Sequence, residues 1–171
     1  MRKLIKLFVV LVFAVTAVSA NGQNLKFGHI DLQGLVQLMP ERTEAESEFS
    51  AFQGDLEEVF GEMQQNYQQK LTELEKLGEE ASEVKRNAKI AELQELQQRI
   101  QNYQATANQQ LQQKQAEVLE PVFDKAEKAI EEVAKEQGLL YVFDTGTRVV
   151  LYKSNQSIDL LPLVKKKLNI Q

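Results

Sequence analysis

The chain has 171 residues, 43% of them apolar and 26% charged, and a formal net charge of −5, so it is expected to form one domain or one domain with a long appendage. The acidic balance argues against a nucleic-acid partner, because neutralising phosphates requires a basic surface. With no Cys and a single His, the chain lacks the residues for disulfides, thiol chemistry and metal sites built from several Cys or His ligands.

Residues 1–20 are predicted to be a signal peptide. Three basic residues precede an apolar run at residues 7–18, which is too short for a preferred membrane span. Small residues permit cleavage after Ala20 or after Gly22. The mature protein is therefore expected in the bacterial periplasm, and the sequence leaves full secretion open.

Residues 21–40 and 138–171 are predicted to form a small β-rich oligomerisation body. In the first of these segments, Leu25–Ile30 has the composition of a short strand. A brief helix is expected to follow from Leu32 to Met39, and Pro40 is expected to end it.

Residues 41–137 are predicted to form a long helical hairpin, the arm. Apolar residues recur every three or four positions over residues 49–74 and again over residues 93–122, which is typical of amphipathic helices. Residues 78–83 contain a Gly and a Ser cap, so the chain is expected to reverse there, although a single long helix stays open. Gly138 is expected to end the second helix.

The arm is acidic and rich in glutamine. It carries 22 acidic and 11 basic residues, and glutamine is an uncharged residue that favours helices. These features favour a solvated coiled-coil face. The most prominent glutamine pairs are Gln64-Gln65, Gln68-Gln69, Gln97-Gln98 and Gln109-Gln110.

The end of the chain is predicted to add a β-hairpin and a helix to the body. Residues 139–143 and 147–152 are rich in β-forming residues and flank a turn at residues 144–146, a pattern that indicates an antiparallel pair. Asp159 is expected to cap a last helix that runs to Leu168.

The predicted body is too small to be stable alone. About 54 residues remain without the signal peptide and the arm, and a unit of that size buries little surface. We therefore expect a homo-oligomer whose subunits share a core. The residues expected at the interface are Phe27, Ile30, Leu140, Val142, Val149 and Leu151.

The order of these segments resembles that of the Skp/OmpH-like periplasmic chaperones, over essentially the whole mature chain. The matching features are residues 26–33 (Lys26-Phe27-Gly28-His29-Ile30-Asp31-Leu32-Gln33), the Pro40 break, the long arm, and residues 139–144, 149–152 and 157–160 before a Lys-rich helix. The resemblance implies an α+β fold with a small β-rich trimerisation body and a long α-helical hairpin arm in each subunit. Three such arms would enclose a cavity for unfolded outer-membrane proteins.

The resemblance also implies a holdase that works without ATP and prevents aggregation of outer-membrane proteins during transport. Its partners would be these unfolded proteins and further copies of the chain in a homotrimer, and a transient contact with the membrane surface stays open. Client contacts are expected at the base of the arm and at a basic cluster near its tip, although each base residue could instead be core between the arm helices. These residues are Phe49, Phe52, Val59, Phe60 and Met63 at the base, and Lys85, Arg86 and Lys89 near the tip.

No enzymatic activity is predicted. His29 alternates with Phe27 and Asp31, so a His/Asp pair is conceivable, but no nucleophile motif or phosphate-binding glycine loop accompanies it. We expect no cofactor and no bound metal. The rival hypothesis is an exported coiled-coil spacer protein that links components of the cell envelope and binds no client.

Overall fold

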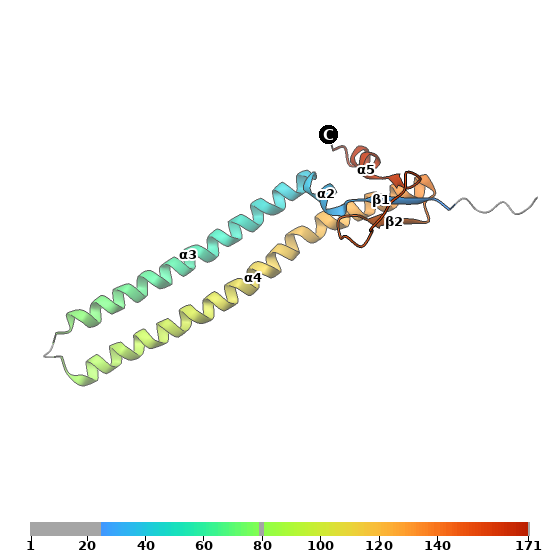
Figure 1. Ribbon diagram of the computed structural model, residues 1–171. Helices are drawn as coiled ribbons and strands as arrows, with labels where there is room; N and C mark the ends of the chain where they lie inside the picture. The colour runs from blue at the N-terminus through green and yellow to red at the C-terminus, as the bar shows by residue number, and fades with distance from the viewer. Residues whose placement is uncertain (1–24, 79–80, 171) are drawn as a thin grey trace, which may run out of the picture. The chain divides into compact units, whose positions relative to one another are not determined.

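The computed structural model describes residues 25–78 and 81–170, and the predicted signal peptide lies outside them. The elements are β1 (Phe27–Ile30), α2 (Leu32–Gln37), α3 (Pro40–Lys76), α4 (Glu83–Gln137), β2 (Tyr141–Asp144), β3 (Ile158–Asp159) and α5 (Leu161–Lys167) (Figure 1). They confirm the predicted α+β class with its long helical arm. Over the described ranges, no helix has the length and apolarity needed to cross a bilayer.

The described residues divide into two compact units. Residues 25–32 and 129–169 form the sheet unit, which contains the three strands, the end of α4 and α5. Residues 33–128 form the arm unit, which contains α3 and most of α4.

The strands of the sheet unit form a parallel sheet in the order β2-β1-β3. The register pairs Phe27 with Tyr141 and His29 with Phe143, while His29 also pairs with Asp159 on the other side. Parallel strands need a long crossover connection. The helices of the arm provide that connection between β1 and β2.

The predicted antiparallel hairpin is wrong. Its first strand forms as β2, and the predicted turn forms as well, since Gly146 N–H donates a hydrogen bond to Asp144 Oδ1 over 2.9 Å. Arg148 then adopts a φ of 58°, a left-handed conformation that interrupts an extended chain. Residues 147–152 consequently form no strand in the described chain, and β2 pairs with β1 instead.

One face of the sheet packs tightly against the rest of the sheet unit. A Cβ added to Gly28 would lie 2.4 Å from Leu160 Cδ1 and 2.7 Å from Leu139 Cδ1. Ile30, Leu160 and Val164 are buried. A side chain at position 28 would therefore have to displace the ends of these two leucine side chains, which favours glycine there.

Helix α5 is held at both of its ends. Asp159 Oδ1 accepts a hydrogen bond from the Leu161 N–H over 3.0 Å, but the N-cap position is Leu160 and not the predicted Asp159. Lys167 Nζ lies 2.8 Å from Glu132 Oε2 and 2.9 Å from Glu136 Oε1 on α4. These contacts raise the pKa of Lys167 and lower the pKa of Glu132, in each case mainly through their shared hydrogen bond.

The arm unit is an antiparallel pair of helices (Figure 1), which confirms the predicted hairpin. Lys114 Nζ of α4 lies 2.6 Å from Glu48 Oε1 of α3, and the Tyr103 hydroxyl donates to the Leu56 carbonyl over 3.0 Å. The reversal follows Gly78, whose φ of 63° suits a residue without a side chain. The buried apolar side chains of α4 in this unit are Leu93, Leu96, Val118, Val122 and Ala126.

Helix α4 ends at Gly138, as predicted. Gly138 has a φ of 64°, its N–H donates to the Lys135 carbonyl, and the Leu139 N–H donates to the Ala134 carbonyl. This pair of hydrogen bonds is a Schellman motif. It directs the chain from α4 into β2.

Candidate functional site

Three aromatic rings gather on the open face of the sheet. Parallel partners in register point to the same side, so Phe27, Tyr141 and Phe143 share one face. Their ring centroids lie 6.4 Å apart for Phe27 and Tyr141, 6.2 Å for Phe27 and Phe143, and 6.1 Å for Tyr141 and Phe143. All three rings are exposed, Tyr141 to 60%. We call these three residues the aromatic face.

Further apolar side chains of the sheet unit are exposed. The most exposed belong to residues 147–152, hereafter the exposed segment, where Leu151 is 94% exposed. Large exposed apolar patches are uncommon on monomers and mark interaction surfaces. The exposed apolar residues in addition to the aromatic face are Leu25, Leu140, Val149, Leu151 and Tyr152.

The structure divides the residues predicted at the oligomer interface into two groups. Phe27, Leu140, Val149 and Leu151 are exposed. Ile30 is 3% exposed and lies on the packed face of the sheet.

Val142 is half-buried and aligns with Gly28 on the same packed face. Ile30 and Val142 therefore help to form the core of their own subunit, and the four exposed residues remain predicted interface contacts. Tyr141 and Phe143 of the aromatic face were not among the predicted residues. Their alternation with Val142 is visible in the sequence, but only the parallel pairing places them beside Phe27.

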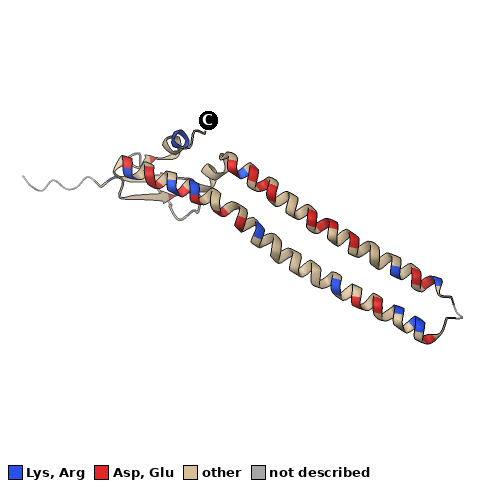
Figure 2. Cartoon of the chain, turned by 180° about the vertical axis from the view of Figure 1, so that it is seen from behind, with Lys and Arg blue, Asp and Glu red and all other residues tan. Residues whose placement is uncertain are grey.

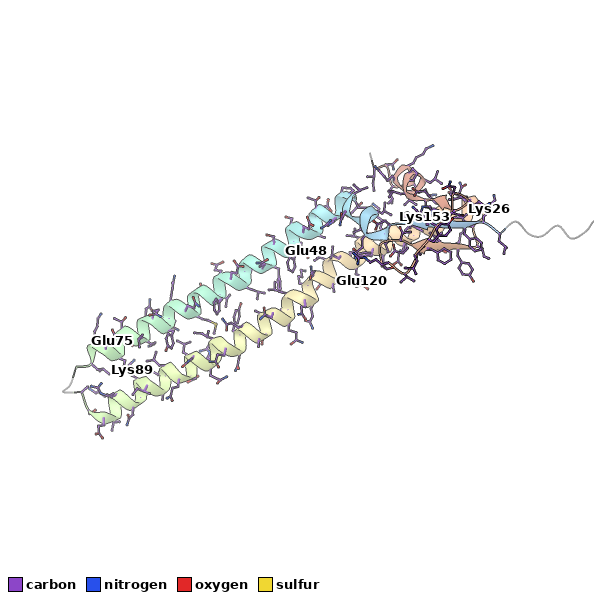
Figure 3. All side chains as sticks on the ribbon, viewed as in Figure 1. Lys26, Glu48, Glu75, Lys89, Glu120 and Lys153 are labelled. Atoms are coloured by element: carbon purple, nitrogen blue, oxygen red, sulfur yellow. The ribbon has the colours of Figure 1, made fainter. Side chains whose placement is uncertain are left out.

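His29 is buried, with 6% of its surface exposed, and it binds the loop that precedes β3. Its Nδ1 lies 2.9 Å from Ser157 Oγ and its Nε2 lies 2.7 Å from Lys153 Nζ, which Figure 3 labels. An ammonium group can only donate, so Nε2 accepts from Lys153 and Nδ1 donates to Ser157. The imidazole therefore fixes this loop to β1. Within the described ranges, no group of three or more His, Cys, Asp or Glu residues could hold a metal ion.

The apolar residues predicted at the arm base lie on α3 of the arm unit. Phe49, Phe52, Phe60 and Met63 are half-buried, and Val59 is 42% exposed. Each side chain therefore touches the hairpin while part of its surface stays accessible.

Phe52 also has a cationic neighbour. Lys114 Nζ lies 6.0 Å from the centroid of the Phe52 ring, which is the outer limit of a cation–π contact. The same Lys114 forms hydrogen bonds to Glu48 and Glu117, which raise its pKa.

Two grooves run between α3 and α4 in the arm unit. The larger one, of about 790 Å³, is lined mainly by amide side chains, and we call it the amide groove. The second, of about 430 Å³, contains apolar and aromatic residues, among them Phe60 and Tyr103. The amide groove is lined by Gly61, Gln64, Gln65, Tyr67, Gln68, Gln69, Gln97 and Ile100.

The basic cluster near the arm tip is largely engaged within the hairpin. Lys89 Nζ, whose residue Figure 3 labels, lies 2.8 Å from Glu73 Oε2 and 3.1 Å from Glu92 Oε2. The hydrogen bond with Lys89 is the main cause of the lowered pKa of Glu73. Arg86 Nη2 donates to the Gly78 carbonyl over 2.6 Å, and Lys85 is exposed.

Charge is unevenly distributed along the arm. Figure 2 shows acidic and basic residues along both helices, with a long uncharged stretch in the middle of α4. Residues 100–113 contain no charged side chain, and neither do residues 63–69 of α3. These two stretches therefore offer amides and apolar groups, whereas the part of α3 that lies opposite residues 100–113 carries Asp55, Glu57 and Glu58.

Comparison with known proteins identifies one family. A family model described as outer membrane protein (OmpH-like) matches residues 26–168. The matched range includes every described strand and helix. A search of curated proteins finds no match to the chain.

Proposed function

The chain belongs to the OmpH-like family, a family of periplasmic chaperones of outer-membrane proteins, and we propose that it is an ATP-independent holdase. In this proposal the signal peptide at residues 1–20 is cleaved on export. The mature protein then binds unfolded outer-membrane proteins and prevents their aggregation during transport. The observation that carries the proposal is the pair of grooves in the arm, beside apolar residues that the hairpin covers only in part.

Holding an unfolded chain requires no nucleotide. An unfolded membrane strand exposes apolar side chains and unpaired backbone groups, which drive aggregation. Many weak contacts along a long arm can hold such a chain without fixing one conformation. Phe49, Phe52, Val59, Phe60 and Met63 are the proposed apolar contacts.

The basic residues near the tip have a smaller role in this proposal. Lys89 and Arg86 already have partners within the hairpin, so a client would have to displace those partners. Lys85 is exposed, has no side-chain partner among the residues that the structure describes, and would make a peripheral contact.

We further propose that the sheet unit assembles into the homotrimer that the family resemblance implies. The aromatic face would be covered by neighbouring subunits, since aromatic residues are enriched in protein interfaces. β2 lies at an edge of the sheet, and the exposed segment has the composition of a strand. If the exposed segment of one subunit paired with the β2 edge of a neighbour, the main-chain groups of that edge and of the segment would form hydrogen bonds with each other.

The test compares an immobilised unfolded outer-membrane protein with the same protein folded in detergent. A holdase retains the unfolded form, with or without ATP, and releases the folded form. Capture of neither form, or of the folded form alone, would favour the spacer hypothesis. Light scattering of the mature protein measures the oligomer separately, with a mass of three chains expected.

A further inference from the structure

The amide groove is lined by five glutamines whose side chains have no partner in the described chain. Gln64, Gln65, Gln68, Gln69 and Gln97 are all exposed. None of their side-chain amides forms a hydrogen bond within the residues that the structure describes.

Two other amides of the arm are paired along their own helix. Gln53 Nε2 donates to Glu57 Oε1 over 2.8 Å, and Gln98 Nε2 donates to Asn102 Oδ1 over 3.0 Å. The groove differs from the rest of the arm in gathering five open amides from both helices around one hollow.

An amide side chain fits the polypeptide main chain in particular. It has two N–H donors and one carbonyl acceptor, and each non-proline residue of a client offers one main-chain donor and one acceptor. Residues 63–69 have no charge, so this part of the arm would not select a client by the charge of its side chains. Such a surface can bind an extended chain regardless of its sequence or direction.

The groove also has a place for the client's side chains. Tyr67 and Ile100 contribute apolar surface among the glutamines. Alternate side chains of an extended strand point to opposite sides, so one set can contact these two residues while the main chain meets the amides. The volume of about 790 Å³ lies within the usual range of ligand sites.

From this geometry we infer that the amide groove binds an extended segment of an unfolded polypeptide by hydrogen bonds from its glutamines to the client main chain. This inference rests on the proposed holdase function and adds the chemical group that is recognised. Each such bond replaces bonds to water and contributes little alone. Several together give a hold that is independent of sequence and readily reversed.

The decisive variant replaces Gln64, Gln65, Gln68 and Gln69 together by Met. Methionine has a similar length and helix preference but is more apolar and cannot donate an N–H. The affinity for a fluorescently labelled outer-membrane protein, diluted from urea, is measured by anisotropy. If the amides bind the main chain, the dissociation constant rises about tenfold. If the groove acts only through apolar contact, the substitution leaves binding unchanged or tightens it, and the inference is overturned.

The matched control replaces Gln109, Gln110, Gln112 and Gln113 by Met. These four glutamines are exposed on α4 and line neither groove, so their replacement should leave the affinity unchanged. An equal loss in both variants would overturn the inference. Circular dichroism checks the helix content of each variant, and the milder pair Gln64→Ala with Gln68→Ala repeats the test if the fourfold variant unfolds.

A second probe acts on the client. A labelled peptide from an outer-membrane strand is compared with the same peptide N-methylated at alternate residues, which removes main-chain donors. Methylation should weaken binding to the wild-type protein and have little effect on the Met variant. Equal weakening in both would contradict main-chain recognition by these amides.

The outcomes separate the inference from the function it rests on. If the wild-type protein bound no unfolded client, the holdase proposal itself would be contradicted. If the wild-type protein and the Met variant bound the client equally well, only the proposed role of the amides would be contradicted. A Met variant with an altered oligomer mass would show that the groove contacts another subunit, which also overturns the inference.

Discussion

The core of the sheet unit and helix α3 of the arm unit differ in how completely they bury their apolar residues. In the sheet unit Leu160 and Val164 have no exposed surface, and Gly28 has no room for a Cβ. In the arm unit the 37 residues of α3 have one buried apolar residue, Ala45. Dense packing on one side of the sheet holds the aromatic face in place, whereas loose packing leaves the apolar groups of α3 accessible. The contrast suggests assembly by the sheet unit and client binding by the arm unit.

The polar contacts between the arm helices do not compensate for the loose apolar packing of α3. The ion pairs between α3 and α4 have partly exposed side chains, and such pairs contribute little to stability because water screens them. The hairpin therefore depends mainly on the α4 seam of Leu93, Leu96 and Val118. Each prediction below tests one side of the comparison.

The largest expected effect is on assembly. Tyr141→Asp places a carboxylate in the aromatic face, where burial against a neighbouring subunit without a partner would cost several kcal/mol. We expect light scattering to report single subunits at concentrations where the wild type forms the proposed trimer. Asn155→Asp adds the same charge at another exposed position of the sheet unit and should leave the mass unchanged. A Tyr141→Asp variant of full mass would exclude the aromatic face from the interface.

The second prediction compares two glycines. Gly28→Val should lower the free energy of unfolding by about 1–3 kcal/mol, because its side chain overlaps Leu160 and Leu139. Gly54→Ala on α3 meets no atom within 4 Å and should raise it by about 0.5–1 kcal/mol. Urea unfolding at one fixed protein concentration measures both. Equal effects of the two substitutions would contradict the difference in packing between the units.

A third prediction concerns the apolar contacts of the arm. Replacing Phe49, Phe52, Phe60 and Met63 together by Ala should weaken client binding about tenfold, equivalent to about 1.4 kcal/mol, because the exposed parts of these side chains would contact the client. The oligomer should persist, since the sheet unit is unchanged. Anisotropy with an unfolded outer-membrane protein measures the affinity.

The control for this variant is Val84→Ala. Val84 is an apolar residue of α4 that is 80% exposed and is not among the proposed contacts, so its truncation should have no effect on binding. Unchanged binding by the fourfold variant would assign the four side chains to the hairpin core alone.

The smallest expected effect is on the pH dependence of stability. The hydrogen bond with Lys167 lowers the pKa of Glu132 below its ordinary value of 4.5, and the hydrogen bond with Lys125 does the same for Glu41. A carboxyl group whose pKa is lower in the folded state stabilises that state above pH 4.5 and loses the effect as the pH falls through the folded pKa. Stability should therefore change little between about pH 6 and 8 through these groups and decrease below about pH 4.5.

Lys167→Met provides the comparison in the sheet unit. Denaturation of this variant across the same pH range should show a smaller decrease on acidification than the wild type. An identical pH profile would mean that the Lys167 contacts have no effect on stability. Lys85→Met removes a charge that has no carboxylate partner in the described hairpin and should reproduce the wild-type profile.

The helices could be predicted from the sequence because their signals are local. The apolar periodicity locates α3 and α4, and Gly78 and Gly138 end them through left-handed conformations. The pairing of the strands could not be predicted in this way, because it depends on contacts between distant parts of the chain. The composition of residues 147–152 is that of a strand, but Arg148 interrupts the extended chain and β2 pairs with β1 more than 100 residues earlier.

Only those features of the candidate site that depend on local sequence could be predicted. The residues at the arm base are visible as an apolar stripe, but the partners of Lys89 and Arg86 depend on the fold of the hairpin. The sequence shows the glutamines and indicates a solvated face. Only the register of α3 and α4 brings Gln97 beside Gln64 and Gln68 in one groove.

The most direct test of the account is the aggregation of an outer-membrane protein diluted from urea, followed by light scattering with and without the mature protein. We expect suppression without ATP at both low and high salt, because contacts of apolar and amide groups dominate, whereas exposed charges are screened over about 8 Å at physiological ionic strength. Suppression that disappears in high salt would assign capture to the charges of the arm, and an absence of suppression at any salt concentration would contradict the holdase function.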